Sequence, residues 1–393
     1  MAVLGLDALI ARGVRDKRVF VRVDLNVPLK NGAITDDTRV RASLPTIQRL
    51  LSAGARVVLA SHLGRPKGKR KPEFSLRPVA PRLAELLGAG VSFCEGCIGP
   101  EVARAVAELA PGSVILLENL RFHAAEEDND ADFAKALAEL ADCYVNDAFG
   151  TAHRAHASTE GITRHVDTVA AGDLLQSELE HLRVVRDPQR PLIVILGGAK
   201  VSDKLAVLEA LAPHADALLI GGAMAYTFLA ARGEPVGASL VEPDRIEDAR
   251  RVIAAAERSG RQLLLPSDHV VAQELAADAP HRVVGAIPDG WMAVDIGPDT
   301  AKRYADEIAR ARTVFWNGPM GVFEMAPFAA GTAAVARAVA GSSATSVVGG
   351  GDSLAAVNQL GVGDRITHLS TGGGASLEYV QGLELPGVAA LER

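Results

Sequence analysis

Short apolar runs, each ending in a polar or glycine-rich cluster and followed by an amphipathic stretch, recur along the whole chain. The runs are continuous rather than alternating, which is typical of strands buried on both faces of a sheet. The stretches between them show helical spacing of apolar residues, as at 38–51, 133–140, 204–211 and 301–311. Alternation of this kind predicts parallel α/β sheets.

The apolar runs form two sets, and a length of 393 residues fits two domains of about 100–200 residues each. We predict an α/β fold of two doubly wound parallel-sheet domains, each with three α/β/α layers, joined by an interdomain helix and hinge. The helix covers 173–185 and ends before Asp187-Pro188, because the residue before a proline disfavours helix. The expected strands are 19–23, 56–60, 91–93, 114–117 and 143–145 in the first half, and 192–196, 217–220, 262–265, 313–316, 345–348 and 366–369 in the second.

Ligands of open α/β sheets bind beyond the carboxyl ends of the strands. In the first half these ends carry arginines and histidines, and Arg39 starts the helix after the first strand. Each residue alone is more often a surface charge or a satisfied histidine. Together they predict a site for a phosphate or carboxylate, since guanidinium groups form paired hydrogen bonds with such anions. The cluster comprises Asp24, Asn26, Arg39, His62, Arg65, Arg121, His153, Arg154 and His156.

The strand ends of the second half are glycine-rich. Glycines between a strand and a helix expose backbone N–H groups that can bind phosphates, although any one cluster can equally be a tight turn. Five such clusters favour a nucleotide site, and Asp352 is a natural Mg²⁺ contact. The clusters are 197–204, 221–223, 317–321, 349–353 and 371–376.

Several function classes are excluded or disfavoured. The net charge of -7 argues against nucleic-acid binding. In the basic loop 65–71, we interpret Lys67, Lys69, Arg70 and Lys71 as solvated surface charges. The uncharged run 217–231 is too short and too rich in glycine to span a membrane, and the start MAVLGLDALIARG does not resemble a secretory signal. The three cysteines fit a reducing cytosol, and Cys94 and Cys97 are interpreted as incidental.

Standard motifs for other enzyme classes are absent from the sequence. There is no G-x-x-x-x-G-K-S/T, no G-x-G-x-x-G, no G-x-S-x-G and no H-E-x-x-H.

Eight segments together resemble the signature segments of the phosphoglycerate kinase family, in the family's order and over nearly the whole chain. They are VDLNVP (23–28), SHLGRP (61–66), ENLRF (118–122), NDAFGTAHRAHAS (146–158), GGAKVSDK (197–204), WNGPMGVFE (316–324), GGGDS (349–353) and STGGGAS (370–376).

The resemblance implies reversible phosphoryl transfer between 1,3-bisphosphoglycerate and ADP, giving 3-phosphoglycerate and MgATP. It implies a cytoplasmic monomer with domains at 1–172 and 189–376, a hinge at 173–188, and a tail at 377–393 that packs back on the first domain. The implied triose-site residues are Asp24, Asn26, Arg39, His62, Arg65, Arg121 and Arg154. The implied nucleotide-site residues are Lys200, Lys204, Asn317, Pro319, Glu324 at the ribose, Gly350, Gly351, Asp352 at the metal, and Ser353.

Transfer to a carboxylate acceptor needs no general base, because the acceptor is already ionised at neutral pH. Catalysis must then come from alignment and charge neutralisation. We expect Arg39 and Lys200, one from each domain, to act catalytically. The resemblance implies that Gly372 to Gly374 present a helix N-terminus to the moving group. Ala293 departs from the family's pattern, which often has glycine there, and this concerns the adenine pocket.

Two other interpretations stay open. A two-domain NAD-dependent dehydrogenase shares the sheet architecture, although the dinucleotide fingerprint is missing. A non-catalytic anion- or nucleotide-binding protein would keep the same sites without turnover.

Overall fold

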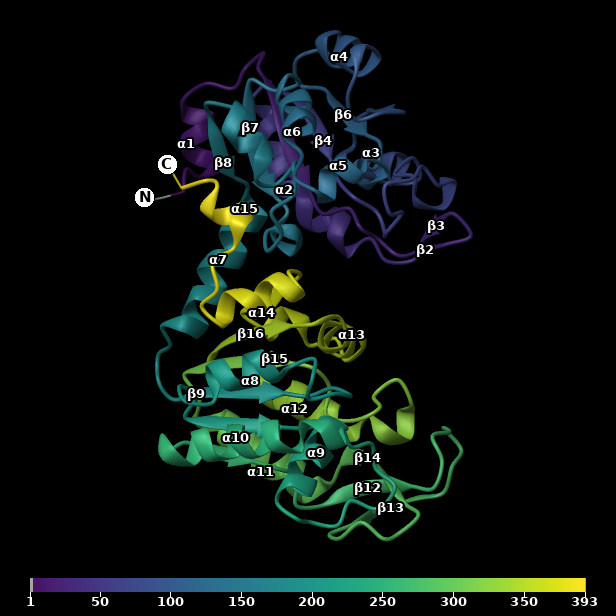
Figure 1. Ribbon diagram of the computed structural model, residues 1–393, viewed down its shortest axis with the longest axis vertical. Coiled ribbons are helices and arrows are strands. Elements are labelled where there is room, and N and C mark those ends of the chain that lie inside the picture. Colours follow the sequence, from purple (N-terminus) through teal and green to yellow (C-terminus); the bar gives the residue numbers. More distant parts are fainter. Residues whose placement is uncertain (1–2, 393) are drawn as a thin grey trace. The chain divides into compact units, whose positions relative to one another are not determined.

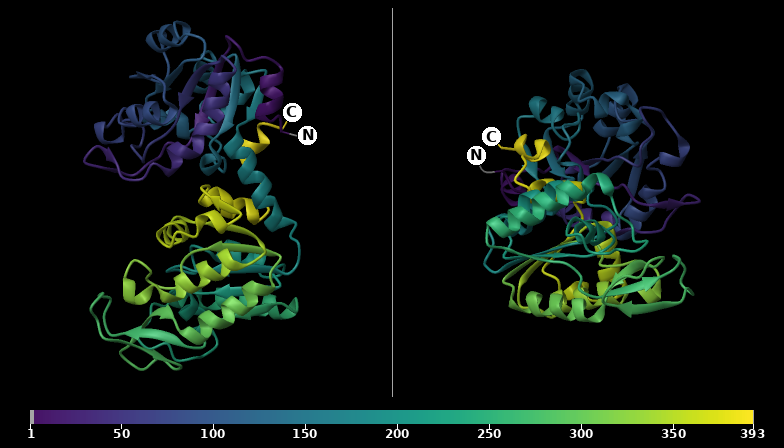
Figure 2. Two further views of the ribbon diagram at one scale, coloured as in Figure 1. Left: turned by 180° about the vertical axis from the view of Figure 1, so that it is seen from behind. Right: turned by 60° about the horizontal axis from the view of Figure 1, so that its bottom comes forward.

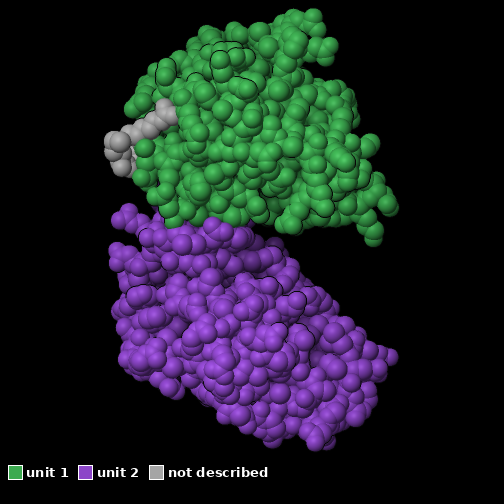
Figure 3. All heavy atoms as spheres, in the orientation of Figure 1, with its two compact units in different colours: residues 1–179, 384–393 green, residues 180–383 purple. Residues whose placement is uncertain are grey.

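The computed structural model describes residues 3–392, shown as a ribbon in Figures 1 and 2. The chain divides into two compact units, coloured separately in Figure 3. Unit 1 consists of residues 1–179 and 384–393, and unit 2 consists of residues 180–383. Each unit is built around one parallel sheet with flanking helices, so the predicted fold class is confirmed.

Unit 1 contains a parallel sheet in the order β5-β6-β4-β1-β7-β8. Alternate residues of its strands face opposite sides, and both sides are buried. Helices α1, α2 and α3 pack on the side of Val19 and Val21. The strands are β1 (Arg18–Val23), β4 (Arg56–Ala60), β5 (Val91–Cys94), β6 (Val114–Leu117), β7 (Cys143–Asp147) and β8 (Val169–Ala171). The helices are α1 (Leu6–Ala11), α2 (Thr38–Ser52), α3 (Val79–Leu87), α4 (Pro100–Ala107), α5 (Ala124–Glu127), α6 (Ala131–Ala138) and α15 (Pro386–Ala389), with short turns η2 (Leu120–Phe122) and η3 (Phe149–Thr151).

Unit 2 contains a parallel sheet in the order β11-β10-β9-β15-β16-β17. Successive strands run outward from β9 on one side and from β15 on the other, so the order reverses between β9 and β15. Helices α11 and α12 pack on the side of Ile193 and Trp316. The strands are β9 (Leu192–Leu196), β10 (Ala217–Ile220), β11 (Gln262–Leu264), β15 (Thr313–Asn317), β16 (Thr345–Gly349) and β17 (His368–Ser370). The helices are α8 (Leu205–Leu211), α9 (Met224–Ala231), α10 (Ile246–Arg258), α11 (Pro298–Arg310), α12 (Ala330–Gly341), α13 (Gly351–Gln359) and α14 (Gly374–Val380).

Two antiparallel elements were not predicted. One is the hairpin β2 (Leu29–Lys30) and β3 (Ala33–Ile34) in unit 1. The other is a three-stranded sheet in unit 2 made of β12 (His269–Ala272), β13 (His281–Val284) and β14 (Met292–Ile296). Their strands are short and one carries a bulge, so they lack the continuous apolar runs that revealed the parallel strands.

Helix α7 (Asp173–Arg186) crosses from unit 1 to unit 2, with the division between Leu179 and Glu180. In unit 1, the buried Asp147 at the end of β7 accepts hydrogen bonds from the backbone N–H groups of Leu174 (2.9 Å) and Leu175 (3.3 Å). This arrangement caps the helix.

Two ring contacts attach the end of α7 within unit 2. The ring of His181 stacks on His368 with centroids 4.3 Å apart. Arg186 lies over the ring of Tyr379 on α14 at 5.0 Å.

The end of the chain returns to unit 1, whereas residues 377–383 group with unit 2. The Gly387 backbone N–H donates to the Ala152 carbonyl at 2.8 Å, and Asn146 Nδ2 donates to the Gly387 carbonyl at 3.1 Å. Within residues 3–392, no helix is both long and apolar enough to cross a membrane.

Candidate active site

The predicted anion-binding residues of unit 1 follow four neighbouring strands. β1 pairs in parallel with β4 and β7, and β4 pairs in parallel with β6. The carboxyl ends of all four strands therefore meet at one edge of the sheet. Asp24 and Asn26 follow β1, His62 and Arg65 follow β4, Arg121 lies in η2 after β6, and Arg154 follows η3 after β7.

Hydrogen bonds tie these loops to one another. Thr151 Oγ1 donates to Asp24 Oδ1 at 2.5 Å, and Asn26 Oδ1 accepts the Gly64 backbone N–H at 2.8 Å. Arg39, in the first turn of α2, donates from Nη1 to the Asn26 carbonyl at 3.1 Å. The loops after β1, β4 and β7 and the start of α2 are thus fixed relative to one another before any ligand binds.

The arginines at this edge differ in burial. Arg121 is buried and donates from Nη1 to the Gly64 carbonyl at 3.0 Å, with Glu127 at 3.3 Å from its Nε. Burial lowers the pKa of Arg121, yet a guanidinium keeps its charge in proteins. Arg39 is half-buried, whereas Arg65 and Arg154 are exposed and free to reach an incoming anion.

Two histidines at the same edge, His62 and His156, are neutral. Burial first, and then the positive charges of Arg22, Arg121 and Arg39, hold the pKa of His62 well below its ordinary value. Burial and the same kind of charge lower the pKa of His156 to about 3. The electrostatics of this edge therefore come from the arginines, and they favour an anionic ligand.

Sequence reasoning missed Arg22, which is fully buried in β1 and contacts His62. A signal was present, because a charged residue stands inside the otherwise apolar run 19–23. Sequence reasoning also missed Glu126 of α5, a buried carboxylate that holds Ser158.

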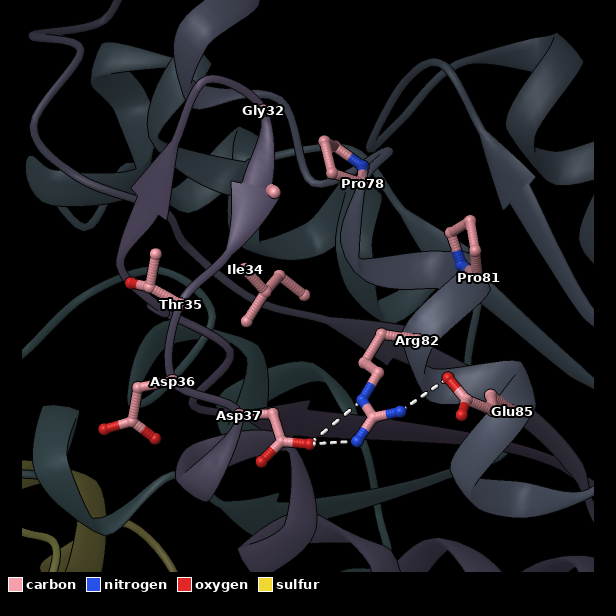
Figure 4. Close-up of a pocket in the computed structure, with 10 residues that line it drawn as sticks. Gly32, Ile34, Thr35, Asp36, Asp37, Pro78, Pro81, Arg82 and Glu85 are labelled. Atoms are coloured by element: carbon pink, nitrogen blue, oxygen red, sulfur yellow. Dashed lines mark hydrogen bonds and ion pairs between the residues drawn. The ribbon is translucent and has the colours of Figure 1, made fainter.

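A hollow of about 730 Å³ lies between the β2–β3 hairpin and α3 (Figure 4). Arg82 of α3 points into it and donates to Asp37 Oδ2 from Nε at 2.9 Å and from Nη2 at 2.6 Å, while Nη1 donates to Glu85 at 2.5 Å. Two carboxylates thus neutralise this arginine, so the hollow is not a second anion site. Asp37 directly precedes α2, and its bond to Arg82 anchors the helix turn that carries Arg39.

The glycine clusters of unit 2 converge where the strand order reverses, between β9 and β15. The Gly197 backbone N–H donates to the Asn317 carbonyl at 3.0 Å, and that of Gly198 donates to the Pro319 carbonyl at 3.1 Å. A Cβ on Gly197 would lie 2.0 Å from the Pro319 carbonyl oxygen, and one on Gly222 would lie 2.5 Å from Gly198 N. Glycine is therefore required at both positions because neighbouring loops approach closely, and not only because the chain turns there.

A cavity of about 220 Å³ opens beside these loops. Its walls are largely apolar, and Glu324 and Asp352 add carboxylates, which suits a ligand with a flat base and polar ends. Of the predicted nucleotide residues, Pro319, Glu324 and Asp352 line it, and Ala293 lines it as well. The other lining residues are Gly198, Ala199, Gly222, Ala223, Tyr226, Val294, Asp295, Met320, Gly321 and Val322.

Other predicted nucleotide residues form a connected group. Lys204 Nζ donates to Asn317 Oδ1, and burial lowers the pKa of Lys204. The Gly318 backbone N–H donates to Ser353 Oγ at 2.6 Å. Gly350 has a φ of +90° and packs close to Asn317, so a side chain there would be strained.

The remaining predicted residues lie at exposed or turn positions. Lys200 and Gly351 are exposed. Gly373 has a φ of +55° and directly precedes α14, and the Gly372 backbone N–H lies 3.4 Å from Ser370 Oγ.

Asp295 is a cavity residue that sequence reasoning missed, although Asp295 interrupts the apolar β14. Its carboxylate accepts the backbone N–H groups of Ile296 (2.9 Å) and Gly331 (2.7 Å). Burial is the largest influence and raises the pKa of Asp295 to about 7.

The comparisons with known proteins agree on one family. The family model described as "Phosphoglycerate kinase" matches residues 10–383. The chain belongs to the phosphoglycerate kinase family. It is 60% identical to the phosphoglycerate kinase of Moorella thermoacetica over 381 residues, covering 96% of this chain and 97% of that protein. It is 58% identical to the phosphoglycerate kinase of Solibacter usitatus over 386 residues, covering 97% of each chain.

Solved phosphoglycerate kinase structures show the same fold. The structure from Coxiella burnetii superposes with a TM-score of 0.90 at 43% identity and covers 99% of each chain. The structure from Pyrococcus horikoshii gives 0.85 at 35% identity and covers 97% of each chain. The dehydrogenase alternative shares the strand order of unit 2, but the relatives of this chain are kinases.

Proposed function

We propose that this chain catalyses reversible phosphoryl transfer between 1,3-bisphosphoglycerate and ADP, giving 3-phosphoglycerate and ATP in glycolysis and gluconeogenesis. One observation carries the proposal. This member of the family has an arginine-rich edge on the sheet of unit 1 and a glycine-lined cavity where the strand order of the unit 2 sheet reverses. The first suits a small phosphorylated acid, and the second suits a nucleotide.

Unit 1, corresponding to the expected domain 1–172 with its returning tail, would bind the triose. Arg65 and Arg154 are exposed and would close on the substrate, while Arg121 is already held in place by Gly64 and Glu127. Asp24 and Asn26 would accept hydrogen bonds from substrate hydroxyls, and His62 would donate one. This division follows from which groups are anchored by contacts within the protein and which are exposed to solvent.

Unit 2, corresponding to the expected domain 189–376, would bind the nucleotide. The base would enter the apolar part of the 220 Å³ cavity, with Glu324 reaching the ribose. The phosphates would face Lys200, Lys204, Asn317 and the 350–353 turn. The lysines and the backbone N–H groups of the turn favour a negatively charged ligand.

The residues present fit a nucleotide-borne Mg²⁺. Among residues 3–392, no three metal-binding side chains gather as a cage, and Asp352 is an exposed carboxylate in the first turn of α13 beside the cavity. Mg²⁺ is commonly held by one or two carboxylates together with phosphates and water. Asp352 would hold the ion, which neutralises phosphate charge when bound.

Transfer requires little covalent chemistry from the protein. In the ATP-consuming direction the substrate carboxylate attacks the γ-phosphorus, the bond to the bridging oxygen of ADP breaks, and no proton needs to be removed. Arg39 and Lys200 would neutralise charge on the transferred group. The N–H groups of Gly372 and Gly373 would point at its oxygens.

The two substrates must come within bonding reach of each other, so we propose hinge closure around α7 within the segment 173–188. We further propose that the enzyme acts as a monomer in the cytoplasm, since each substrate site is assembled from residues of one chain.

A turnover assay tests the function directly. The full-length chain is incubated with MgATP and 3-phosphoglycerate, and both ADP and 1,3-bisphosphoglycerate are measured. We expect both products in equal amounts, and none when 3-phosphoglycerate is omitted. Binding of both substrates without ADP would support the non-catalytic alternative and refute the proposal.

A further inference from the structure

Arg22 is a buried charge in the middle of a sheet. Val19, Val21 and Val23 of β1 belong to the apolar core on one face, which directs Phe20 and Arg22 to the other. On that face Phe20 stacks with Tyr144 at 6.2 Å, and Arg22 is 0% exposed. A cation in such a place costs free energy unless polar partners surround its guanidinium.

The guanidinium of Arg22 has four partners, of which Asp24 Oδ1, 3.5 Å from Nη1, is the most distant. Nε donates to Ser158 Oγ at 2.9 Å, and Nη1 donates to the Val23 carbonyl at 2.5 Å. Nη2 lies 3.1 Å from His62 Nδ1. The group is therefore clamped and presents one N–H to the imidazole of a residue in the candidate triose site.

This contact determines the tautomer of His62. An arginine has five donors and no acceptor, and it stays protonated, so Nδ1 of His62 must be the acceptor. Nδ1 then carries no proton, and the single proton of the neutral ring sits on Nε2. Asp24 does not compete, because its Oδ1 is 3.8 Å from Nδ1 and already accepts from Thr151 Oγ1 at 2.5 Å.

A hydroxyl relay holds Arg22 in turn. Ser158 Oγ accepts from Arg22 and donates to Glu126 Oε1 at 2.6 Å, and the Ser158 backbone N–H donates to Glu126 Oε2 at 3.0 Å. Glu126 is 0% exposed and is connected to Arg22 through Ser158, whereas the direct ion pair of Arg22 is with Asp24, whose Oδ1 lies 3.5 Å from Nη1. The orientation of the guanidinium thus depends on Ser158 and Glu126.

We propose that Arg22, Ser158 and Glu126 are positioning residues that lock His62 as a neutral Nε2–H donor to an oxygen of the phosphorylated acid. This inference rests on the proposed function of the triose site and assigns no role in the transfer itself to the three residues. It explains why Arg22, Ser158 and Glu126 form a connected set of hydrogen bonds beside the neutral imidazole of His62.

Burial is the largest influence that keeps the pKa of His62 low and the ring neutral, and the charge of Arg22 adds to it. Positive groups approach the ring from several elements, and each disfavours a second proton. The positive groups are Arg22 of β1, Arg39 of α2 and Arg121 of η2. The neutral His156 after η3 also faces the ring, and the Asp24 carboxylate, 3.8 Å from Nδ1, acts in the opposite sense.

The tautomer is measured on the ligand-free, full-length protein by nitrogen-15 NMR of labelled histidines, with Arg22→Lys as the main variant. Lysine keeps the positive charge but lacks the planar guanidinium, whose N–H donors have fixed directions. We expect His62 of the wild type to carry its single proton on Nε2 from about pH 6 to 8. In Arg22→Lys the buried ring should stay neutral, but a fraction of the molecules should carry the proton on Nδ1, because the fixed donor to Nδ1 is lost. Arg18→Lys on the same strand, whose side chain pairs with Asp142 at the other end, is the matched control.

Kinetics separate positioning from a general loss of structure. Arg22→Lys should raise the KM for 3-phosphoglycerate at least about tenfold, while kcat and the KM for ATP change little. Ser158→Ala should shift KM in the same direction and serves if Arg22→Lys does not fold. A proton on Nδ1 of wild-type His62, or variants with an unchanged tautomer and an unchanged KM for 3-phosphoglycerate, would overturn the inference. Absent wild-type turnover would instead refute the proposed function, because the tautomer is read without substrate.

Discussion

Arg39 lies in the first turn of α2, anchored through the Asn26 carbonyl, and Lys200 lies in an exposed glycine-rich turn of the other unit. If both neutralise the transferred group, Arg39→Ala and Lys200→Ala should each lower kcat by roughly 100- to 1000-fold, as for a lost transition-state donor. Steady-state kinetics with both substrates measure this. Arg164→Ala and Lys302→Ala remove exposed, ion-paired cations elsewhere and should leave kcat unchanged. A near-normal kcat in either active-site variant would remove that residue from the mechanism.

Gly222 allows a second prediction at the residue scale. Its φ is +66°, and an added Cβ would lie 2.5 Å from both Gly198 N and Gly198 O. Gly233 has a similar φ of +79° but has nothing within 4 Å of an added Cβ, so it controls for backbone strain alone. Gly222→Ala should lower the free energy of unfolding by about 2 kcal/mol more than Gly233→Ala, because the loops must move apart. Chemical denaturation of the two variants gives the difference, and equal losses would show that the loops yield without cost.

At the scale of single elements, α7 depends on the carboxylate of Asp147 for its cap. Burial is the largest influence and raises the pKa of Asp147 to about 8, although the N–H groups of Leu174 and Leu175 oppose it. A raised pKa means that the folded state holds the proton more tightly than the unfolded state. The contribution to stability is therefore full below about pH 4 and is lost as the pH rises through about 8.

Asp147→Asn should remove this pH dependence, because the amide keeps an acceptor for the helix and cannot ionise. Relative to the variant, the wild type should lose on the order of 5 kcal/mol of unfolding free energy between about pH 4 and pH 8, because each unit of pKa difference corresponds to about 1.4 kcal/mol. Denaturant titrations across that range give the slope. Asp167→Asn, at an exposed position before β8, is the control. A parallel pH dependence in wild type and Asp147→Asn would contradict the prediction.

The elements that sequence analysis could predict are those with an unmistakable apolar signal. β4, β6, β9 and β10 have the expected bounds because their runs are continuous and sharply ended, whereas β17 begins two residues later than expected. The antiparallel strands β12 and β14 carried no such run, and β8 is only three residues long. Asp147, Arg22 and Asp295 were missed as functional or capping groups for a related reason. Each is a charge within or at the end of a buried strand, and its partner is far away in the sequence.

At the scale of the whole molecule, the proposed closure around α7 predicts a change in size on binding. Small-angle X-ray scattering should show a smaller radius of gyration with 3-phosphoglycerate and a non-hydrolysable MgATP analogue together than without ligands, because transfer needs both substrates in one dry site. Either ligand alone is the control and should give a smaller decrease. An unchanged radius with both ligands bound would count against hinge closure.

Unit 1 is interrupted in the sequence, and this has a consequence for the nascent chain. Asn146 hydrogen-bonds to Gly387, which is synthesised 241 residues later. At about 5–20 residues per second, translation of that interval takes on the order of 10–50 s. The first unit to emerge from the ribosome is therefore the last to be completed. Throughout that interval the surface around Ala152 and Asn146 lacks its final segment, while unit 2 is synthesised between them.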